Sequence, residues 1–234
     1  MKDTRGKEAV IFDMDGVIFD SEALVFACWE KVAEKYGVEN VKEACRECLG
    51  INAVETKKCF LRRYGKEFPY DIYKKEMSEL FHKTAAEGGL MLKPGVKELL
   101  GFLKEHGYKI ALASSTRKTV VEAELSSAGI LQYFDEVICG DMVKRSKPEP
   151  DIYLRAAEKI KVLPNKCYAI EDSYNGIRSA HAAGMDVIMV PDLLPPNKEI
   201  EETCCNIFDS LFQVIALLQE ENNYKVSSEK VSPV

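Results

Sequence analysis

The chain has 234 residues, of which 46% are hydrophobic, and a formal net charge of −6. This length allows one good-sized domain plus an insertion, and the negative charge argues against a nucleic-acid-binding surface. No apolar run approaches the ~20 residues of a membrane helix, and the first dozen residues lack the layout of a signal peptide. We therefore expect a cytoplasmic monomer without nucleic-acid or membrane partners, whose eight cysteines stay reduced.

Residues 9–12 form a short apolar run that ends in two carboxylates, Asp13 and Asp15. Bulky and β-branched residues predict a buried strand, and residues i and i+2 of extended backbone project the same way. Gly16 then permits a turn that a residue with a Cβ would resist. The two carboxylates should converge at the strand's carboxyl end, where open α/β sheets bind ligands. Such a pair needs a cation or a proton on one member; solvated aspartates in a turn are the alternative.

Helical periodicity runs from Glu22 to about Gly89 and no strand signal interrupts it. The pattern predicts a helical insertion that can close over a site and exclude water, with a passive helical decoration as the alternative. Within it, Cys45 and Cys48 have the spacing of a redox or metal pair. No partner pair or nearby His accompanies them, so a structural role is favoured.

A second apolar strand is predicted at residues 109–113, and it ends in the hydroxyls of Ser114, Ser115 and Thr116. A helical pattern follows from about Arg117 to Ala128. Exposed amides at a helix start, together with hydroxyls, can hold a phosphate. Ser and Thr are also ordinary helix caps, which is the alternative here.

Lys147 precedes Pro148, which biases the lysine toward extended backbone. A third buried strand is predicted at residues 167–170 and ends in Glu171 and Asp172. A solvated surface position is the alternative for the lysine. The third strand would deliver further acids to the edge of the sheet that receives Asp13.

Taken in order, these motifs resemble the four motifs of the haloacid dehalogenase (HAD) superfamily, over about residues 8–192. The segments 13–22 and 171–177 are similar to the β-phosphoglucomutase-like phosphatases, which carry a helical cap just after the first motif. The resemblance implies an α/β fold with a Rossmann-like parallel-sheet core and an inserted α-helical cap. The motifs are Asp13-Met14-Asp15-Gly16, Ser114, Lys147 and Glu171-Asp172, and the expected parts are the core (1–20 and 92–219), the cap (21–91) and a loose polar tail (220–234).

By this resemblance the chain is a Mg²⁺-dependent phosphomonoesterase acting on a small phosphorylated metabolite, such as a sugar or polyol phosphate. Asp13 would attack phosphorus to give an aspartyl-phosphate, and Asp15 would exchange protons with the leaving group and with water. Mg²⁺ is a hard ion that prefers oxygen ligands. The resemblance assigns the metal to Asp13, the Asp15 carbonyl, Asp172 and Glu171 (the last as ligand or close neighbour), and the phosphoryl oxygens to Ser114, Ser115 and Lys147.

Two alternatives remain. The first is a sugar phosphomutase, but the cap histidine and arginine of β-phosphoglucomutases align with Val25 and Ala53, so both are missing. The second is a non-catalytic binding protein. It is disfavoured because every catalytic position of the four motifs holds a residue that can perform the reaction. The cluster at residues 116–118 could touch a distal phosphate or be a solvated helix start. Hydrolysis is therefore favoured over phosphate transfer.

Overall fold

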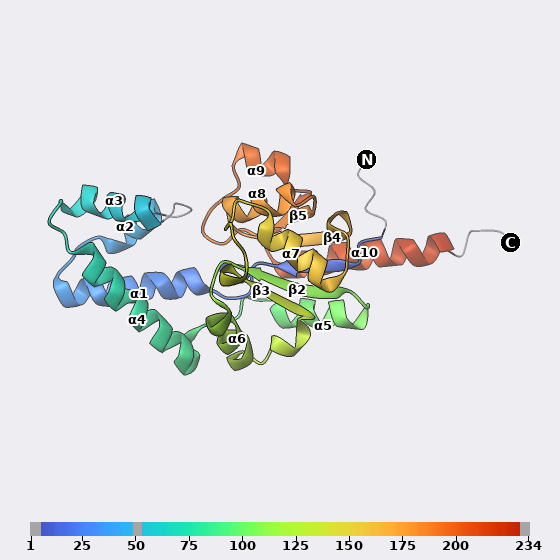
Figure 1. The fold of residues 1–234 in the computed structure, drawn as a ribbon, viewed down its shortest axis with the longest axis horizontal. Helices are drawn as coiled ribbons and strands as arrows, with labels where there is room; N and C mark the ends of the chain where they lie inside the picture. Colours follow the sequence, from blue (N-terminus) through green and yellow to red (C-terminus); the bar gives the residue numbers. More distant parts are fainter. Residues whose placement is uncertain (1–5, 49–52, 230–234) are drawn as a thin grey trace. The chain divides into compact units, whose positions relative to one another are not determined.

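A six-stranded parallel sheet organises the larger part of the chain (Figure 1). The computed structural model describes residues 6–48 and 53–229. The strand order is β3-β2-β1-β4-β5-β6, so the first strand lies inside the sheet and the chain builds outward from it on both sides. The strands are β1 (Ala9–Phe12), β2 (Lys109–Ser114), β3 (Glu136–Cys139), β4 (Cys167–Glu171), β5 (Asp186–Met189) and β6 (Asn206–Ile207).

This order confirms the predicted α/β class and fixes where a ligand can bind. The strand order reverses at β1, and the crevice outside the carboxyl ends of strands at such a point is where open parallel sheets bind ligands. Strands β2 and β4 each extend one residue beyond their predicted ends. The motif residues Asp13, Ser114, Glu171 and Asp172 therefore lie at the last positions of strands or directly after them, and Lys147 lies between β3 and the next α-helix.

The chain divides into two compact units, one of which is purely helical. The sheet unit comprises the described residues up to Ile18 and from Leu92 onward, and the helical unit spans Phe19–Met91. The helical unit includes α1 (Ser21–Tyr36), α2 (Val41–Glu47), α3 (Ala53–Tyr64), α4 (Tyr70–Thr84) and the π-helical turn η1 (Ala85–Gly89). The sheet unit includes α5 (Val96–Glu105), α6 (Lys118–Ser127), α7 (Asp151–Ile160), α8 (Tyr174–Ala182), α9 (Lys198–Thr203) and α10 (Leu211–Glu229).

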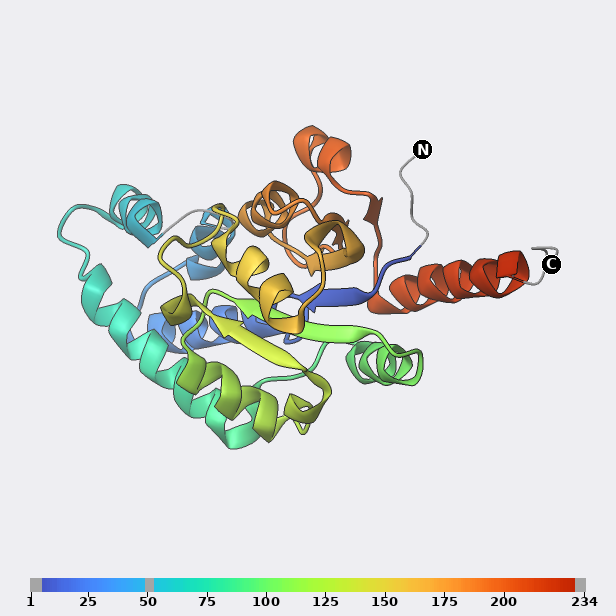
Figure 2. The same ribbon diagram turned by 45° about the vertical axis from the view of Figure 1, so that its right-hand side comes forward.

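Each unit has its own apolar core. In the sheet unit, α7 and α8 pack on one face of the sheet, and α5 packs against β2 and α10 (Figures 1 and 2). In the helical unit, aromatic rings pack together: the ring centroids of Trp29 and Phe60 are 4.8 Å apart, and those of Phe60 and Tyr70 are 5.1 Å apart. Aromatic pairs of this kind add to the stability gained from area burial alone. The helical unit is therefore held together by contacts among its own residues.

The last helix is longer than expected, and this corrects the prediction of a loose tail from residue 220. Helix α10 continues to Glu229, and residues 230–234 lie outside the described part. No Gly or Pro interrupts residues 211–229. The Tyr168 hydroxyl donates to Glu221 Oε1 at 2.6 Å and the Tyr108 hydroxyl donates to Asn222 Oδ1 at 3.3 Å, so the second half of α10 is tied to the sheet unit. Across the described residues, no helix combines the length and the apolar character needed to cross a membrane.

Candidate active site

Asp13 lies where the inner strand β1 ends beside β4. All four residues of β1 are fully buried, and the strand pairs with β2 on one side and β4 on the other. The backbone N–H of Asp13 donates to the carbonyl of Ile170 at 3.0 Å, so pairing with β4 continues one residue beyond the strand. The Asp13 side chain, 11% exposed, is thereby held at the carboxyl edge of the sheet.

Gly16 lets the loop after β1 approach Asp172 closely. Its φ of +77° lies in the left-handed region that favours glycine. A Cβ at this position would lie 2.2 Å from Oδ2 of Asp172. Any side chain at residue 16 would therefore displace that carboxylate. Besides reversing the chain, the turn at Gly16 allows Asp172 to pack against the loop that carries Asp13 and Asp15.

Lys147 joins carboxylates that leave two different strands. Its Nζ lies 2.6 Å from Asp13 Oδ1 and 2.6 Å from Glu171 Oε1, and 8% of its side chain is exposed. The alternative of a solvated surface lysine is therefore wrong. The peptide bond between Lys147 and Pro148 is cis. Loss of the lysine would leave two neighbouring carboxylates in the interior without this cation, which is strongly destabilising.

Glu171 is completely buried and accepts hydrogen bonds at both oxygens. Oε1 accepts from Lys147 and, at 2.7 Å, from the Tyr153 hydroxyl. Oε2 accepts from the Asp172 N–H at 3.2 Å, the Ser173 N–H at 3.2 Å and the Ser173 hydroxyl at 3.0 Å. A Cβ at Gly176, in the first turn of α8, would lie 1.8 Å from Oε1. The carboxylate is therefore fixed in one orientation, directed at Lys147.

The loop after β2 places a buried hydroxyl and a contact to Asp15 at the same edge. Ser114 is fully buried, and its Oγ accepts from the Thr116 N–H at 3.1 Å. The Thr116 hydroxyl donates to Asp15 Oδ2 at 3.3 Å. The N–H of Gly140 donates to the Thr116 carbonyl, and a Cβ on that glycine would lie 2.2 Å from the Ser115 carbonyl oxygen. The loop after β2 is therefore packed against Gly140, the residue that directly follows β3.

The other candidates of this loop are solvent-facing. Ser115, Arg117 and Lys118 are exposed. The Lys118 N–H donates to Asp141, and its ammonium lies 3.6 Å from Glu122 one turn along α6. The structure therefore brings together Asp13, Asp15, Ser114, Lys147, Glu171 and Asp172, while Ser115 lies next to the group with its side chain open to solvent.

The group carries more negative charge than one lysine balances. Burial raises the pKa of Asp13 to about 7; Lys147 opposes this shift and Glu171 adds to it. Burial also raises the pKa of Asp172 well above its ordinary value, and the charges of Glu171 and Asp13 add to the effect. Burial opposes the charge on Lys147, yet the adjacent carboxylates raise its pKa. These shifts show that a further positive charge at this place would be stabilised.

The donor set fits a divalent cation. Carboxylate oxygens of Asp13, Glu171 and Asp172 lie within 4.8 Å of one another. If all three are ionised beside one ammonium, the net charge is minus two, which a divalent cation would neutralise. Oxygen-only ligation suits Mg²⁺. Because both oxygens of Glu171 already accept hydrogen bonds, Asp13 and Asp172 are the better direct ligands, and Glu171 is better placed just outside them.

Two contacts and one electrostatic effect in this group have no clear signal in the sequence. The Tyr153 hydroxyl on Glu171 comes from α7 and is completely buried. The Thr116 hydroxyl contacts Asp15, a neighbour that strand-end spacing alone does not reveal. On α6, burial and then the charge of Asp15 raise the pKa of Glu124 to about 7. The position of Tyr153 near the start of the helix that follows Lys147 is the one hint available from the chain.

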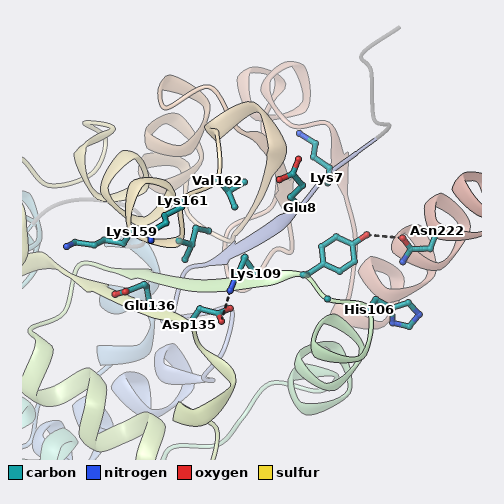
Figure 3. Close-up of a pocket in the computed structure, with 13 residues that line it drawn as sticks. Lys7, Glu8, His106, Lys109, Asp135, Glu136, Lys159, Lys161, Val162 and Asn222 are labelled. Atoms are coloured by element: carbon teal, nitrogen blue, oxygen red, sulfur yellow. Dashed lines mark hydrogen bonds and ion pairs between the residues drawn. The ribbon is translucent and has the colours of Figure 1, made fainter.

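A cavity of about 770 Å³ lies at the other edge of the sheet (Figure 3). Its lining includes Glu8, just before β1, and Lys109, the first residue of β2, whereas Asp13 and Ser114 lie at the opposite ends of these strands. Four lysines and three acidic residues line it, and Lys109 lies 3.5 Å from Asp135. This cavity is therefore separate from the group at the carboxyl edge, and its lining mixes both signs of charge.

The two cap positions that bear on a mutase activity differ in what the structure shows. Val25 lies in α1 and packs, partly buried, against the core of the helical unit. It offers no group that exchanges protons. The segment 49–52, which precedes Ala53, lies outside the described residues. Ala53 is the first residue of α3.

Comparison with known proteins gives a consistent result. Residues 10–190 match the model of the haloacid dehalogenase-like hydrolases. The chain is 37% identical over 183 residues to a phosphorylated carbohydrates phosphatase of Thermotoga maritima, covering 77% of this chain and 83% of the relative. It is 32% identical to the β-phosphoglucomutase of Bacillus subtilis, covering 78% and 83%. The crystal structure of a putative β-phosphoglucomutase from Thermotoga maritima superimposes with a TM-score of 0.76 at 33% identity, covering 91% and 99%.

Proposed function

The chain belongs to the haloacid dehalogenase-like hydrolases, a family with phosphatase members, and on that premise we propose that it hydrolyses a small phosphorylated carbohydrate or polyol. The observation that carries the proposal is the contact of one buried ammonium with two carboxylates: Lys147 bridges Asp13 and Glu171 at 2.6 Å each. A carboxylate held beside a fixed cation at a strand end has the placement required of a nucleophile that attacks an anionic ester. A solvated turn would not need such support.

In the first half of the reaction, a carboxylate oxygen of Asp13 forms a bond to phosphorus while the ester oxygen of the substrate departs. Lys147 and the Ser114 hydroxyl stabilise the phosphoryl oxygens, on which negative charge is concentrated in the transition state. Protonated Asp15 gives its proton to the departing alkoxide. The products of this half are an alcohol and an aspartyl-phosphate at Asp13.

In the second half, Asp15 acts in its ionised form. It takes a proton from water as the water oxygen attacks phosphorus, and the bond to Asp13 breaks, which releases inorganic phosphate and restores the Asp13 carboxylate. The Thr116 hydroxyl donates to Asp15 Oδ2 at 3.3 Å and so favours the ionised form. Asp15 therefore ends each cycle protonated and ready to serve as the acid.

Mg²⁺ would be held by Asp13, the Asp15 carbonyl and Asp172, with Glu171 beside them. When bound, it supplies positive charge that neutralises the carboxylates and polarises a phosphoryl oxygen. The residues fit this group because their buried carboxylates have raised pKa values and oxygen-only donors. The same cation would keep Asp13 ionised for attack.

A sugar phosphomutase is the second candidate, since one relative is the β-phosphoglucomutase of Bacillus subtilis. A mutase must hold a second phosphate and protect its phospho-enzyme from water. Val25 and Ala53 provide neither the proton-transfer group nor the anion-binding group that the mutase resemblance calls for. These two positions favour hydrolysis.

A screen of phosphorylated metabolites for Mg²⁺-dependent phosphate release tests the proposal, and phosphorus NMR of the hits separates the two candidates. We expect sugar or polyol phosphates to yield inorganic phosphate, with no positional isomer accumulating and no stimulation by a sugar bisphosphate. Conversion of a sugar 1-phosphate to its 6-phosphate faster than phosphate appears would establish the mutase instead.

A further inference from the structure

A second buried ion pair lies at the carboxyl edge of the sheet. Lys93 Nζ is 2.5 Å from Asp192 Oδ1, and the two side chains are 19% and 8% exposed. Lys93 follows the helical unit in the chain, and its backbone N–H donates to the Ile18 carbonyl at 2.9 Å. Asp192 follows β5. The reaction outlined above gives this pair no role.

Strand pairing brings the segments that carry Asp172 and Asp192 to the same edge of the sheet. In the register of β4 and β5, Glu171 is opposite Met189, and the Val190 N–H donates to the Glu171 carbonyl at 2.8 Å. Asp172 and Asp192 therefore follow neighbouring parallel strand ends. Consistent with this, the charge of Asp192 contributes, after burial, Glu171 and Asp13, to the raised pKa of Asp172.

One oxygen of Asp192 is unused. Its Oδ2 is buried and has no hydrogen-bond partner within the described residues, while Lys93 engages Oδ1. Leaving a charged oxygen buried without a donor costs free energy. A donor that arrives with a ligand would remove this cost. Mg²⁺ usually keeps several of its water ligands, and such waters are hydrogen-bond donors.

We propose that Asp192 is a positioning residue for a hydrated divalent cation at Asp13 and Asp172, which it assists by accepting a hydrogen bond from a water ligand and by its charge. The inference rests on the proposed function for the cation site itself. Substitution of a residue that contacts a metal through one of its ligands commonly lowers metal affinity by roughly 10–100-fold. Lys93 screens part of the Asp192 charge, so the two members of the pair should have opposite effects on cation binding.

Calorimetric titration of the full-length protein with Mg²⁺, without substrate, tests this. Asp192→Asn should raise the Kd for Mg²⁺ by ~10-fold. Lys93→Met removes a neighbouring positive charge and keeps the carboxylate, so it should bind Mg²⁺ at least as tightly as the wild type. Asp135→Asn is the matched control, because it also removes a lysine-paired aspartate, but at the other edge of the sheet, and its Kd should stay within twofold.

A purely structural ion pair would behave differently: Asp192→Asn and Lys93→Met would weaken Mg²⁺ binding equally, or neither would change it. Either result overturns the inference. If Asp192→Asn does not fold, the double variant Lys93→Met/Asp192→Asn avoids the unpaired lysine, and it should bind Mg²⁺ ~10-fold more weakly than Lys93→Met. Phosphate release is measured separately, so a protein that binds Mg²⁺ as described but hydrolyses no phosphate ester would reject the proposed function and leave this inference standing.

Discussion

The two edges of the sheet use the same kinds of charged residue with different results. At the carboxyl edge, Lys147 is 8% exposed and Glu171 is fully buried, and they meet at 2.6 Å. At the amino edge, Lys109 is 54% exposed and lies 3.5 Å from Asp135, beside a cavity of about 770 Å³. The ion pair beside this cavity is solvated, whereas the charged groups at the carboxyl edge are buried and in direct contact. Convergence and burial of charged groups therefore identify the site, and the presence of a cavity does not.

The largest expected contrast is between two aspartate substitutions. Asp13→Asn keeps the side-chain size but removes the attacking charge, so phosphate release should fall to background while the fold survives. Asp135→Asn, at the amino edge, should keep near-wild-type turnover. Steady-state phosphate release and circular dichroism of both variants provide the measurement. Near-wild-type turnover by a folded Asp13→Asn protein would end the aspartyl-phosphate mechanism.

Substitutions of the lysines at the two edges should differ nearly as much in their effect on kcat/KM. Lys147→Ala leaves buried carboxylates facing the substrate phosphate, and we expect kcat/KM to fall by at least ~100-fold, by analogy with the loss of one oxyanion donor. Ser114→Ala should cost less because backbone amides remain as donors. Lys109→Ala removes an exposed ion pair. Such pairs contribute ~0–1 kcal/mol to stability, and this one takes no part in the chemistry, so kcat/KM should not change. Full activity of the Lys147→Ala variant would contradict the proposal, which is based on the contacts of Lys147 with Asp13 and Glu171.

The stability of the protein without metal should respond to pH with opposite signs at the two edges. The pKa of Asp13 is raised from 3.8 to about 7, so the folded state holds its proton more firmly than the unfolded state does. This contribution to the free energy of unfolding is present below pH about 4 and is lost as the pH rises through about 7. Asp135 is the reverse case: in spite of burial, the Ile110 N–H and Lys104 lower its pKa, so its contribution is lost as the pH falls below its ordinary range.

Chemical denaturation between pH 3 and 8, without metal, measures both effects. The decline toward pH 7 should shrink in Asp13→Asn, and the decline on the acid side should shrink in Asp135→Asn. Adding Mg²⁺ should restore stability near neutral pH in the wild type, because a ligand that binds the folded state stabilises it. A wild-type curve that rises steadily from pH 4 to 7 would contradict the raised pKa of Asp13.

Local sequence signals explain why part of this arrangement was predictable. The apolar runs that became β1, β2 and β4 each end in polar residues, and parallel strands bring such ends to one edge. The sequence predicts a turn at Gly16, but the close approach of this glycine to Asp172 depends on two strands at once. The convergence of the motifs follows from the chain, whereas their exact spacing follows from packing.

The remaining features arise from contacts between distant segments. Tyr153 and Glu171 are joined by the packing of α7 on the sheet, and a tyrosine in a helix carries no sign of its partner. Strand β6 has two residues, too few to give an alternating pattern. Helix α10 is hydrogen-bonded at residues 221 and 222 by Tyr168 and Tyr108, which lie far from it in the sequence. Polar composition alone therefore predicted a loose tail where a helix continues.

The smallest contrast concerns single hydroxyls at the start of one helix. The Thr116 hydroxyl donates to Asp15 Oδ2 at 3.3 Å, whereas Thr119, in the first turn of α6, is exposed. Thr116→Val removes one hydrogen bond to a charged group, worth about 1.5–3 kcal/mol at most, and because the bond is long we expect a loss of roughly 3–10-fold in kcat/KM. Thr119→Val is the matched control and should be unchanged.

The choice of substrate makes this last prediction specific to proton transfer. An aryl phosphate has a leaving group that scarcely needs a proton, so its first half-reaction depends little on how Asp15 is held. Single-turnover rates of Thr116→Val should therefore fall more for an alkyl phosphate than for an aryl phosphate. Equal losses for the two esters, with Thr119→Val unaffected, would show that Thr116 shapes the phosphate-binding loop and does not position the acid. The contrast between the edges would then rest on Asp13 and Lys147 alone.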